Sequence, residues 1–128
     1  MPITPLFAAI FAIIYVVLSF GVIKHRFAKQ VSLGDGQDKQ LQTAIRAHGN
    51  FAEYVPFALL LMWFLEIVAY EFTLVLILGT ALLVARLAHV VGLRDPKKYI
   101  VLRQLGTMAT FAVLLFSAGR LIWQYFPV

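Results

Sequence analysis

Uncharged, mostly apolar runs recur four times along the chain, and segments with charged residues separate them. The runs cover residues 1–23, 54–65, 72–85 and 104–119. A helix needs about 20 residues to cross roughly 30 Å of hydrocarbon, so only the first run is long enough by itself. The other three reach that length when they extend into the polar residues beside them. The pattern predicts a single domain, residues 1–128, with four membrane helices at about 4–25, 42–67, 72–92 and 104–125.

The composition supports this reading of the pattern. Hydrophobic residues make up 62% of the chain, charged residues make up 13%, and the mean hydropathy is +0.87. Such values are typical of membrane proteins and unlike those of soluble domains. We therefore predict an all-α integral membrane protein whose subunit is a four-helix bundle. The chain has no cysteine, so any thiol chemistry must come from a ligand.

Positive charge is distributed unevenly among the connections between the predicted helices. Ten of the eleven Lys and Arg residues lie in or beside the first and third connections: Lys24, Arg26, Lys29, Lys39, Arg46, Arg86, Arg94, Lys97, Lys98 and Arg103. The second connection carries Glu66 and Glu71 instead. The positive-inside rule then places both termini outside the cytoplasm. Topology and the anionic headgroups of the bilayer explain the net charge of +5 better than nucleic acid does, so we expect no nucleic-acid partner.

The second predicted helix carries a polar stripe into the membrane. At about 100° per residue, Arg46, Asn50 and Glu53 project within a sector of roughly 60°. With a rise of 1.5 Å per residue, Glu53 lies about 10 Å deeper than Arg46. A charge at the centre of a membrane helix costs about 2.5–3.5 kcal/mol on insertion scales. We therefore expect Glu53 to face protein, water or a partner ion.

Further cationic residues are expected at the same membrane depth as this polar stripe. Arg86 and His89 share a face of the third helix at positions i and i+3, and Arg103 opens the fourth helix. Together with Arg46, these arginines outnumber the one glutamate, and a small anionic ligand would balance the excess because guanidinium groups bind carboxylates through paired hydrogen bonds. A structural alternative remains open, in which Glu53 pairs with an arginine of another helix.

The stripe and its surroundings resemble a known family. The motif Arg46-Ala-x-x-Asn50-x-x-Glu53-Tyr54, followed by Pro56, resembles that of the MAPEG family, the membrane-associated proteins in eicosanoid and glutathione metabolism. The Arg86-Leu-Ala-His89 segment and the four-helix pattern extend the resemblance over nearly the whole chain, and its small bacterial members are the most similar. The resemblance implies a homotrimer in the bacterial inner membrane, with glutathione bound at subunit interfaces near the cytoplasmic face.

The resemblance also implies roles for individual residues. Arg103 and Arg86 would be catalytic and stabilise the glutathione thiolate. The residues that would bind glutathione are Arg46, Asn50, Glu53, Tyr54, His89 and, from a neighbouring subunit, Arg26. Leu93 replaces a tyrosine that several members carry one turn after the histidine. The implied activity is a glutathione transferase, a lipid-hydroperoxide peroxidase, or both, in which the thiolate attacks an apolar electrophile. Glutathione is then a co-substrate, and we expect no metal and no haem.

Three other functions remain open at this point. The protein could bind glutathione or another anion without catalysis. A trimer could form a pore, although polar residues do not continue through the full depth of the predicted helices. His48 and His89 could hold a haem between two helices, although both lie toward helix ends.

Overall fold

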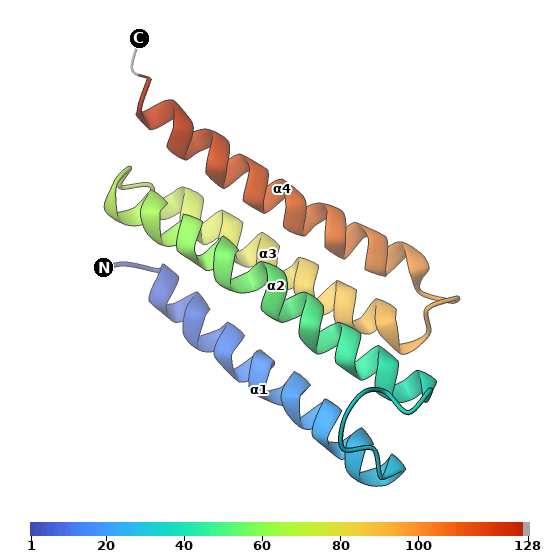
Figure 1. Ribbon diagram of the computed structural model, residues 1–128. Coiled ribbons are helices and arrows are strands. Elements are labelled where there is room, and N and C mark those ends of the chain that lie inside the picture. Colours follow the sequence, from blue (N-terminus) through green and yellow to red (C-terminus); the bar gives the residue numbers. More distant parts are fainter. Residues whose placement is uncertain (127–128) are drawn as a thin grey trace.

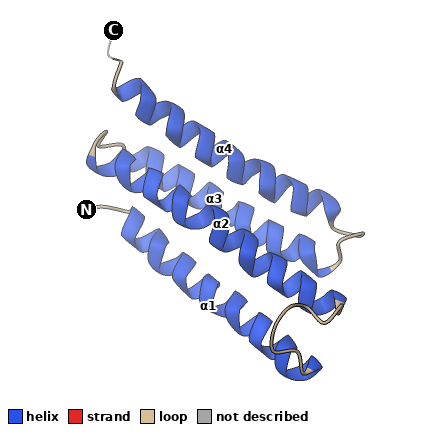
Figure 2. Cartoon of the chain, in the orientation of Figure 1, coloured by secondary structure: helices blue, strands red, loops and turns tan. Residues whose placement is uncertain are grey.

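The computed structural model describes residues 1–126, which form four helices joined by short connections (Figures 1 and 2). The helices are α1 (Thr4–Lys29), α2 (Lys39–Ile67), α3 (Phe72–Arg94) and α4 (Ile100–Gln124). Each is long and apolar enough to cross a membrane, and the described part of the chain contains no strand. The predicted fold class, an all-α four-helix membrane protein, is confirmed.

The helices run antiparallel, so the charged connections meet at one end of the bundle. Figure 1 shows the N-terminus, the end of α4 and the α2–α3 connection together at one end, and the other two connections at the opposite end. We call the latter the basic end, because ten of the eleven Lys and Arg residues lie in that half of the bundle. Here the helices extend up to four residues beyond the predicted bounds. Long cationic side chains can reach the headgroups from such positions.

The two central helices, α2 and α3, pack against the two outer helices, α1 and α4. α1 packs mainly on α2 and α4 packs mainly on α3, whereas α1 and α4 lie on opposite sides of the bundle (Figure 1). The core is apolar and includes Phe11, Met62 and Leu82. Two glycines bring α3 and α4 close together near the basic end. A Cβ atom at Gly92 would lie 2.6 Å from the Arg103 nitrogen, and one at Gly106 would lie 2.5 Å from the Ala85 oxygen. The two backbones therefore touch.

At the end of the bundle opposite the basic end, charged side chains form structural hydrogen bonds and an ion pair. Glu66 lies in the last turn of α2, inside the predicted bounds of 42–67, and is only 1% exposed. Its carboxylate accepts hydrogen bonds from the backbone nitrogens of Ile3 and, at 2.9 Å, Thr4. Since the first N–H groups of a helix have no partner within the helix, Glu66 caps α1 from a distance. Arg120 is paired with Glu71, with its Nε 2.9 Å from the carboxylate.

Candidate functional site

A polar cavity of about 250 Å³ opens between α2, α3 and α4 in the basic half of the bundle. It is lined by two residues from each helix: Arg46, Asn50, His89, Leu93, Arg103 and Thr107. Four of the site residues that the sequence predicted therefore come together: Arg46, Asn50, His89 and Arg103. The close contact of α3 with α4 at Gly92 and Gly106 determines how near their side chains stand.

Arg86 lies behind this lining and is only 1% exposed. Its Nη2 donates a hydrogen bond to Oδ1 of Asn50 and lies 3.4 Å from Nδ1 of His89. Its guanidinium carbon is 5.9 Å from the centre of the Phe51 ring. Its Nε and Nη1 atoms have no hydrogen-bond partner among residues 1–126. Arg86 does not line the cavity but contacts Asn50 and His89, which do, and its predicted catalytic role stays a prediction.

The contacts of Arg86 determine which atoms its neighbours offer to a ligand. Because Oδ1 of Asn50 accepts from the guanidinium, the amide nitrogen of Asn50 remains as a donor. Nδ1 of His89 lies 3.4 Å from the same guanidinium group, and the tautomer with its proton on Nε2 makes Nδ1 an acceptor for this contact and leaves the Nε2–H group as a donor. With the guanidinium groups of Arg46 and Arg103, the polar lining is rich in donors and contains no carboxylate. Such a lining suits an anionic ligand.

Two further predicted residues, Glu53 and Tyr54, lie beside the cavity without lining it. Glu53 pairs with Arg46 at 3.8 Å, and their side chains are 56% and 63% exposed. The arginine that Glu53 contacts within the chain thus lies on its own helix, whereas the structural alternative placed that arginine on another helix. Tyr54 is half-buried, and its ring forms a T-shaped contact with the ring of Phe111 at a centroid distance of 5.4 Å.

Arg26 lies outside the polar cavity of its own chain. Its Nη1 donates to the backbone oxygens of Gly34 at 2.8 Å and Val31 at 3.4 Å, both in the α1–α2 connection. The prediction that it contacts glutathione concerned a neighbouring subunit, and it stays a prediction.

The sequence analysis missed Thr107 as a lining residue. Thr107 lies one turn after Arg103, and its hydroxyl donates to the Arg103 carbonyl at 3.1 Å. The spacing of four residues could have indicated it. His48, in contrast, stacks on Tyr15 with ring centroids 4.8 Å apart and does not line the cavity. Among residues 1–126, no three His, Asp or Glu side chains gather in a way that could hold a metal ion.

Comparison of the sequence with known proteins identifies the family of the chain. The sequence model of the MAPEG family matches residues 4–123, which include every residue that lines the polar cavity. The chain belongs to the MAPEG family. This MAPEG chain is also similar to the inner membrane protein YecN of Escherichia coli K12, with 37% identity over 125 residues that cover 98% of this chain and 93% of YecN. YecN of E. coli O6:H1 gives the same values.

No solved structure matched the chain. The resemblance seen in the Arg46–Tyr54 motif is confirmed by the family match. The MAPEG family includes glutathione-dependent enzymes, and the donor-rich lining of the cavity is compatible with glutathione, which carries two carboxylates.

Proposed function

We propose that this MAPEG protein is a membrane enzyme that binds glutathione in the polar cavity and directs its thiolate at an apolar electrophile, as a transferase or a lipid-hydroperoxide peroxidase. One observation carries the proposal. Two arginines, one asparagine and one histidine from three helices line one cavity, and its lining contains no carboxylate. Glutathione has two carboxylates, one ammonium and one thiol, and is complementary to this arrangement.

The charges suggest how the tripeptide is oriented. Arg46 offers a planar pair of donors to one carboxylate. Glu53, next to Arg46 and facing outward, provides the negative charge that the ammonium group needs. Asn50 and His89 donate to the remaining acceptor oxygens. Tyr54, beside Glu53 on the same helix, then contacts the outer part of the ligand.

Arg103 and Arg86 take different parts in this mechanism. Arg103 lines the cavity and can lie against the sulfur, where its charge favours the thiolate over a thiol whose pKa is about 8.5 when unperturbed. The thiolate is the nucleophile, so the protein needs none of its own. In the transferase reaction its sulfur forms a bond to an electrophilic carbon and the leaving group departs with the bonding electrons. Arg86 acts as a positioning residue through Asn50 and His89.

A neighbouring copy would complete the site. Small-molecule pockets usually exceed about 300 Å³, whereas the cavity of one chain measures about 250 Å³ and opens beside the exposed Glu53. A homotrimer would cover Glu53 and Tyr54 and bring Arg26 of another copy toward the ligand. The positive-inside rule directs the basic end to the cytoplasm and the termini to the other side, and the similarity to YecN favours the inner membrane.

Equilibrium binding of glutathione to the detergent-purified protein tests the proposal. Wild type should bind glutathione and show the ultraviolet absorbance of a thiolate, and Glu53→Ala should lose affinity. Arg103→Gln should lose more affinity for glutathione than for S-methylglutathione, which has no ionisable thiol. Arg120→Gln is the matched control, since it removes an arginine from the other end of α4.

Turnover separates an enzyme from a binding protein. Conjugation of chlorodinitrobenzene or reduction of a lipid hydroperoxide should accompany binding and should fall in Arg103→Gln. Binding without turnover of either substrate would favour the alternative of a noncatalytic glutathione- or anion-binding protein. Wild type that binds no glutathione would refute the proposed site.

A further inference from the structure

We propose that a groove between α1 and α2 binds a membrane-soluble phenol, an apolar aromatic molecule whose hydroxyl group donates to the backbone oxygen of Ala52. The groove has a volume of about 340 Å³, and α1 and α2 of the same chain form its walls. Such a volume lies within the range of small-molecule sites. The groove shares no residue with the polar cavity, so the inference does not depend on the proposed function.

Three alanines leave room for the groove within the membrane. Ala8 and Ala12 lie one turn apart on α1, and Ala52 lies on the α2 side. Larger side chains at these positions would fill the space between the helices. Residues 1–23 carry no charge, and Ala52 follows Arg46 by six residues, which places it about 9 Å deeper. The groove therefore lies in the hydrocarbon.

Aromatic rings form a large part of the lining. Phe11 and Phe51 are almost fully buried, and their ring centroids are 5.9 Å apart. Tyr15 stacks on Phe51 at 6.0 Å and is 39% exposed. Aromatic pairs prefer offset-stacked or edge-to-face arrangements. A planar aromatic ligand can adopt these arrangements with the part of the Tyr15 ring that the chain leaves uncovered.

Pro56 leaves one backbone acceptor of the groove without its helical partner. α2 continues through Pro56, which has no N–H group. In a helix the oxygen of residue i accepts from the nitrogen of residue i+4, so this hydrogen bond is missing at Ala52. The Ala52 oxygen points along the helix axis toward Pro56, and both residues line the groove.

No hydroxyl of residues 1–126 replaces the missing donor. In other membrane helices, Ser and Thr side chains, ordered waters or neighbouring helices pair with oxygens that a proline has freed. Here each Ser or Thr hydroxyl that donates a hydrogen bond does so to the carbonyl four residues earlier in its own helix. Tyr15, the one lining residue with a polar side chain, does not donate to the Ala52 oxygen. An acceptor without a donor is costly in hydrocarbon.

A phenol satisfies both features of the groove at once. Its hydroxyl donates to the Ala52 oxygen, and its ring packs on the aromatic lining. An acyl chain would cover the rings but has no donor, and a water molecule would donate without covering them. Because hydrocarbon offers no competing donor, the hydrogen bond to Ala52 forms without displacing water.

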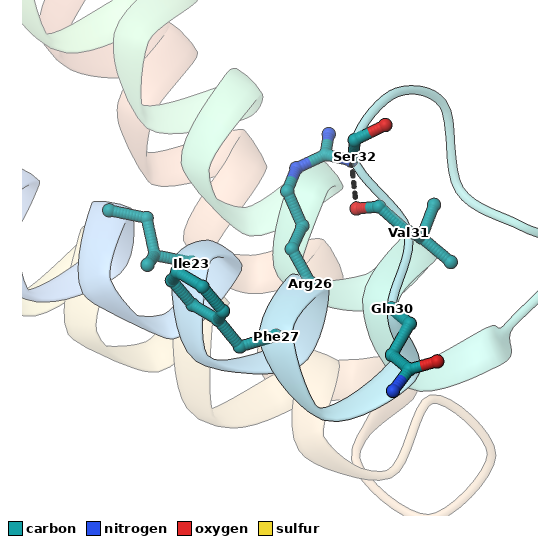
Figure 3. Close-up of a pocket in the computed structure, with 6 residues that line it drawn as sticks. All are labelled: Ile23, Arg26, Phe27, Gln30, Val31 and Ser32. Carbon is teal, nitrogen blue, oxygen red and sulfur yellow. Dashed lines mark hydrogen bonds between the residues drawn. The ribbon is translucent and has the colours of Figure 1, made fainter.

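The groove is distinct from the opening at the basic end of α1. Figure 3 shows that opening, in which Arg26 is turned toward the segment that carries Val31 and Ser32. Its lining begins at Ile23, about two turns beyond Tyr15, and shares no residue with the groove. The inference therefore leaves Arg26 available for the ligand of a neighbouring copy.

Equilibrium dialysis of the full-length protein in neutral detergent tests the hydrogen bond with naphthol and its methyl ether, which has the same rings without the donor. Uptake by detergent micelles alone is subtracted. Wild type should bind naphthol about fivefold more tightly than the ether, the effect expected of one hydrogen bond. Pro56→Ala supplies the N–H group that pairs with the Ala52 oxygen and should remove this preference. Pro5→Ala is the matched control and should keep it, because Pro5 lies in the first turn of α1, where an N–H group has no helical partner.

A pair of alanine variants tests the position of the ligand. Ala12→Leu should fill the groove and weaken binding of naphthol and of the ether to the same degree. Ala9→Leu should bind both as wild type does, because Ala9 is an exposed alanine of the same helix that does not line the groove.

The inference is overturned by equal binding of naphthol and the ether to wild type, by a preference that survives in Pro56→Ala, or by equal effects of Ala12→Leu and Ala9→Leu. A change of oligomeric state in Ala12→Leu, measured by size-exclusion chromatography, would also overturn it, because the groove would then be a contact between copies. Circular dichroism checks that Pro56→Ala remains folded. If it does not, the preference of wild type and the pair of alanine variants decide the matter.

Discussion

The contact between α3 and α4 beside the polar cavity can be tested by one methyl group. In Gly106→Ala, the new Cβ would lie 2.5 Å from the Ala85 oxygen and 2.9 Å from the His89 nitrogen. Both atoms belong to the backbone of α3, so no side-chain rotation can relieve the overlap. Ordinary contact begins at 3.4 Å, and the helices must therefore separate by about 0.9 Å, the difference between 3.4 and 2.5 Å.

A control variant separates the loss of folding stability caused by moving the helices apart from the gain caused by the higher helix propensity of alanine. Replacing glycine by alanine within a helix stabilises it by about 1 kcal/mol, whereas overpacking costs about 1–3 kcal/mol. Gly119→Ala makes the same replacement in α4 at a position with no atom of another residue close by. The two variants should thus differ by about 1–3 kcal/mol, with Gly106→Ala the less stable. Thermal unfolding in detergent measures this difference.

The same displacement should disturb the ligand site. His89 and Leu93 lie on α3, and Arg103 and Thr107 lie on α4, so separating the helices moves the two sides of the cavity apart. A misplacement of about 1 Å can cost about 100-fold in rate. We expect Gly106→Ala to lose about 10- to 100-fold in turnover and to bind glutathione more weakly, while Gly119→Ala keeps both. If Gly106→Ala melts and binds as Gly119→Ala does, the argument from close helix contact is wrong.

Three other predictions follow from contacts outside the cavity. Glu66→Ala should destabilise the protein by about 2 kcal/mol or more, because the Ile3 and Thr4 nitrogens lose their acceptor, and the Thr4 amide should exchange hydrogen faster. Arg120→Gln should cost at most about 1 kcal/mol in thermal unfolding, because the pair that it forms is partly exposed. Asp38→Ala should lower the melting temperature at neutral pH, since Asp38 caps α2 through the Leu41 nitrogen. The hydrogen bond from the Leu41 nitrogen, and after it the contact with Lys29, lowers the pKa of Asp38. The charge of Asp38 therefore stabilises the fold above about pH 4, and this contribution is lost as the pH falls through the lowered pKa. In a pH series of melting curves, the difference in melting temperature between Asp38→Ala and wild type should shrink as the pH falls.

Much of the fold could be predicted from local pattern. Apolar runs and their length define four membrane helices, because a bilayer requires about 20 residues for each crossing. The distribution of Lys and Arg indicates which connections lie together, since antiparallel helices bring alternate connections to the same end. The Arg46–Tyr54 motif indicates the family, and helical periodicity shows that Arg46, Asn50 and Glu53 share one face.

Only the tertiary structure decided how these faces meet. Periodicity orders residues within a helix, but the rotation and spacing of helices depend on packing, such as the contacts at Gly92 and Gly106. For this reason Arg103 lines the cavity while Arg86 lies buried behind it, although both are arginines at the same end. The carboxylate of Glu66 accepts a hydrogen bond from the nitrogen of Thr4, 62 positions away in the sequence, and no local pattern encodes this contact. The sequence by itself determined the helices and their charges, and the packing of side chains between helices determined which of those charges face a ligand.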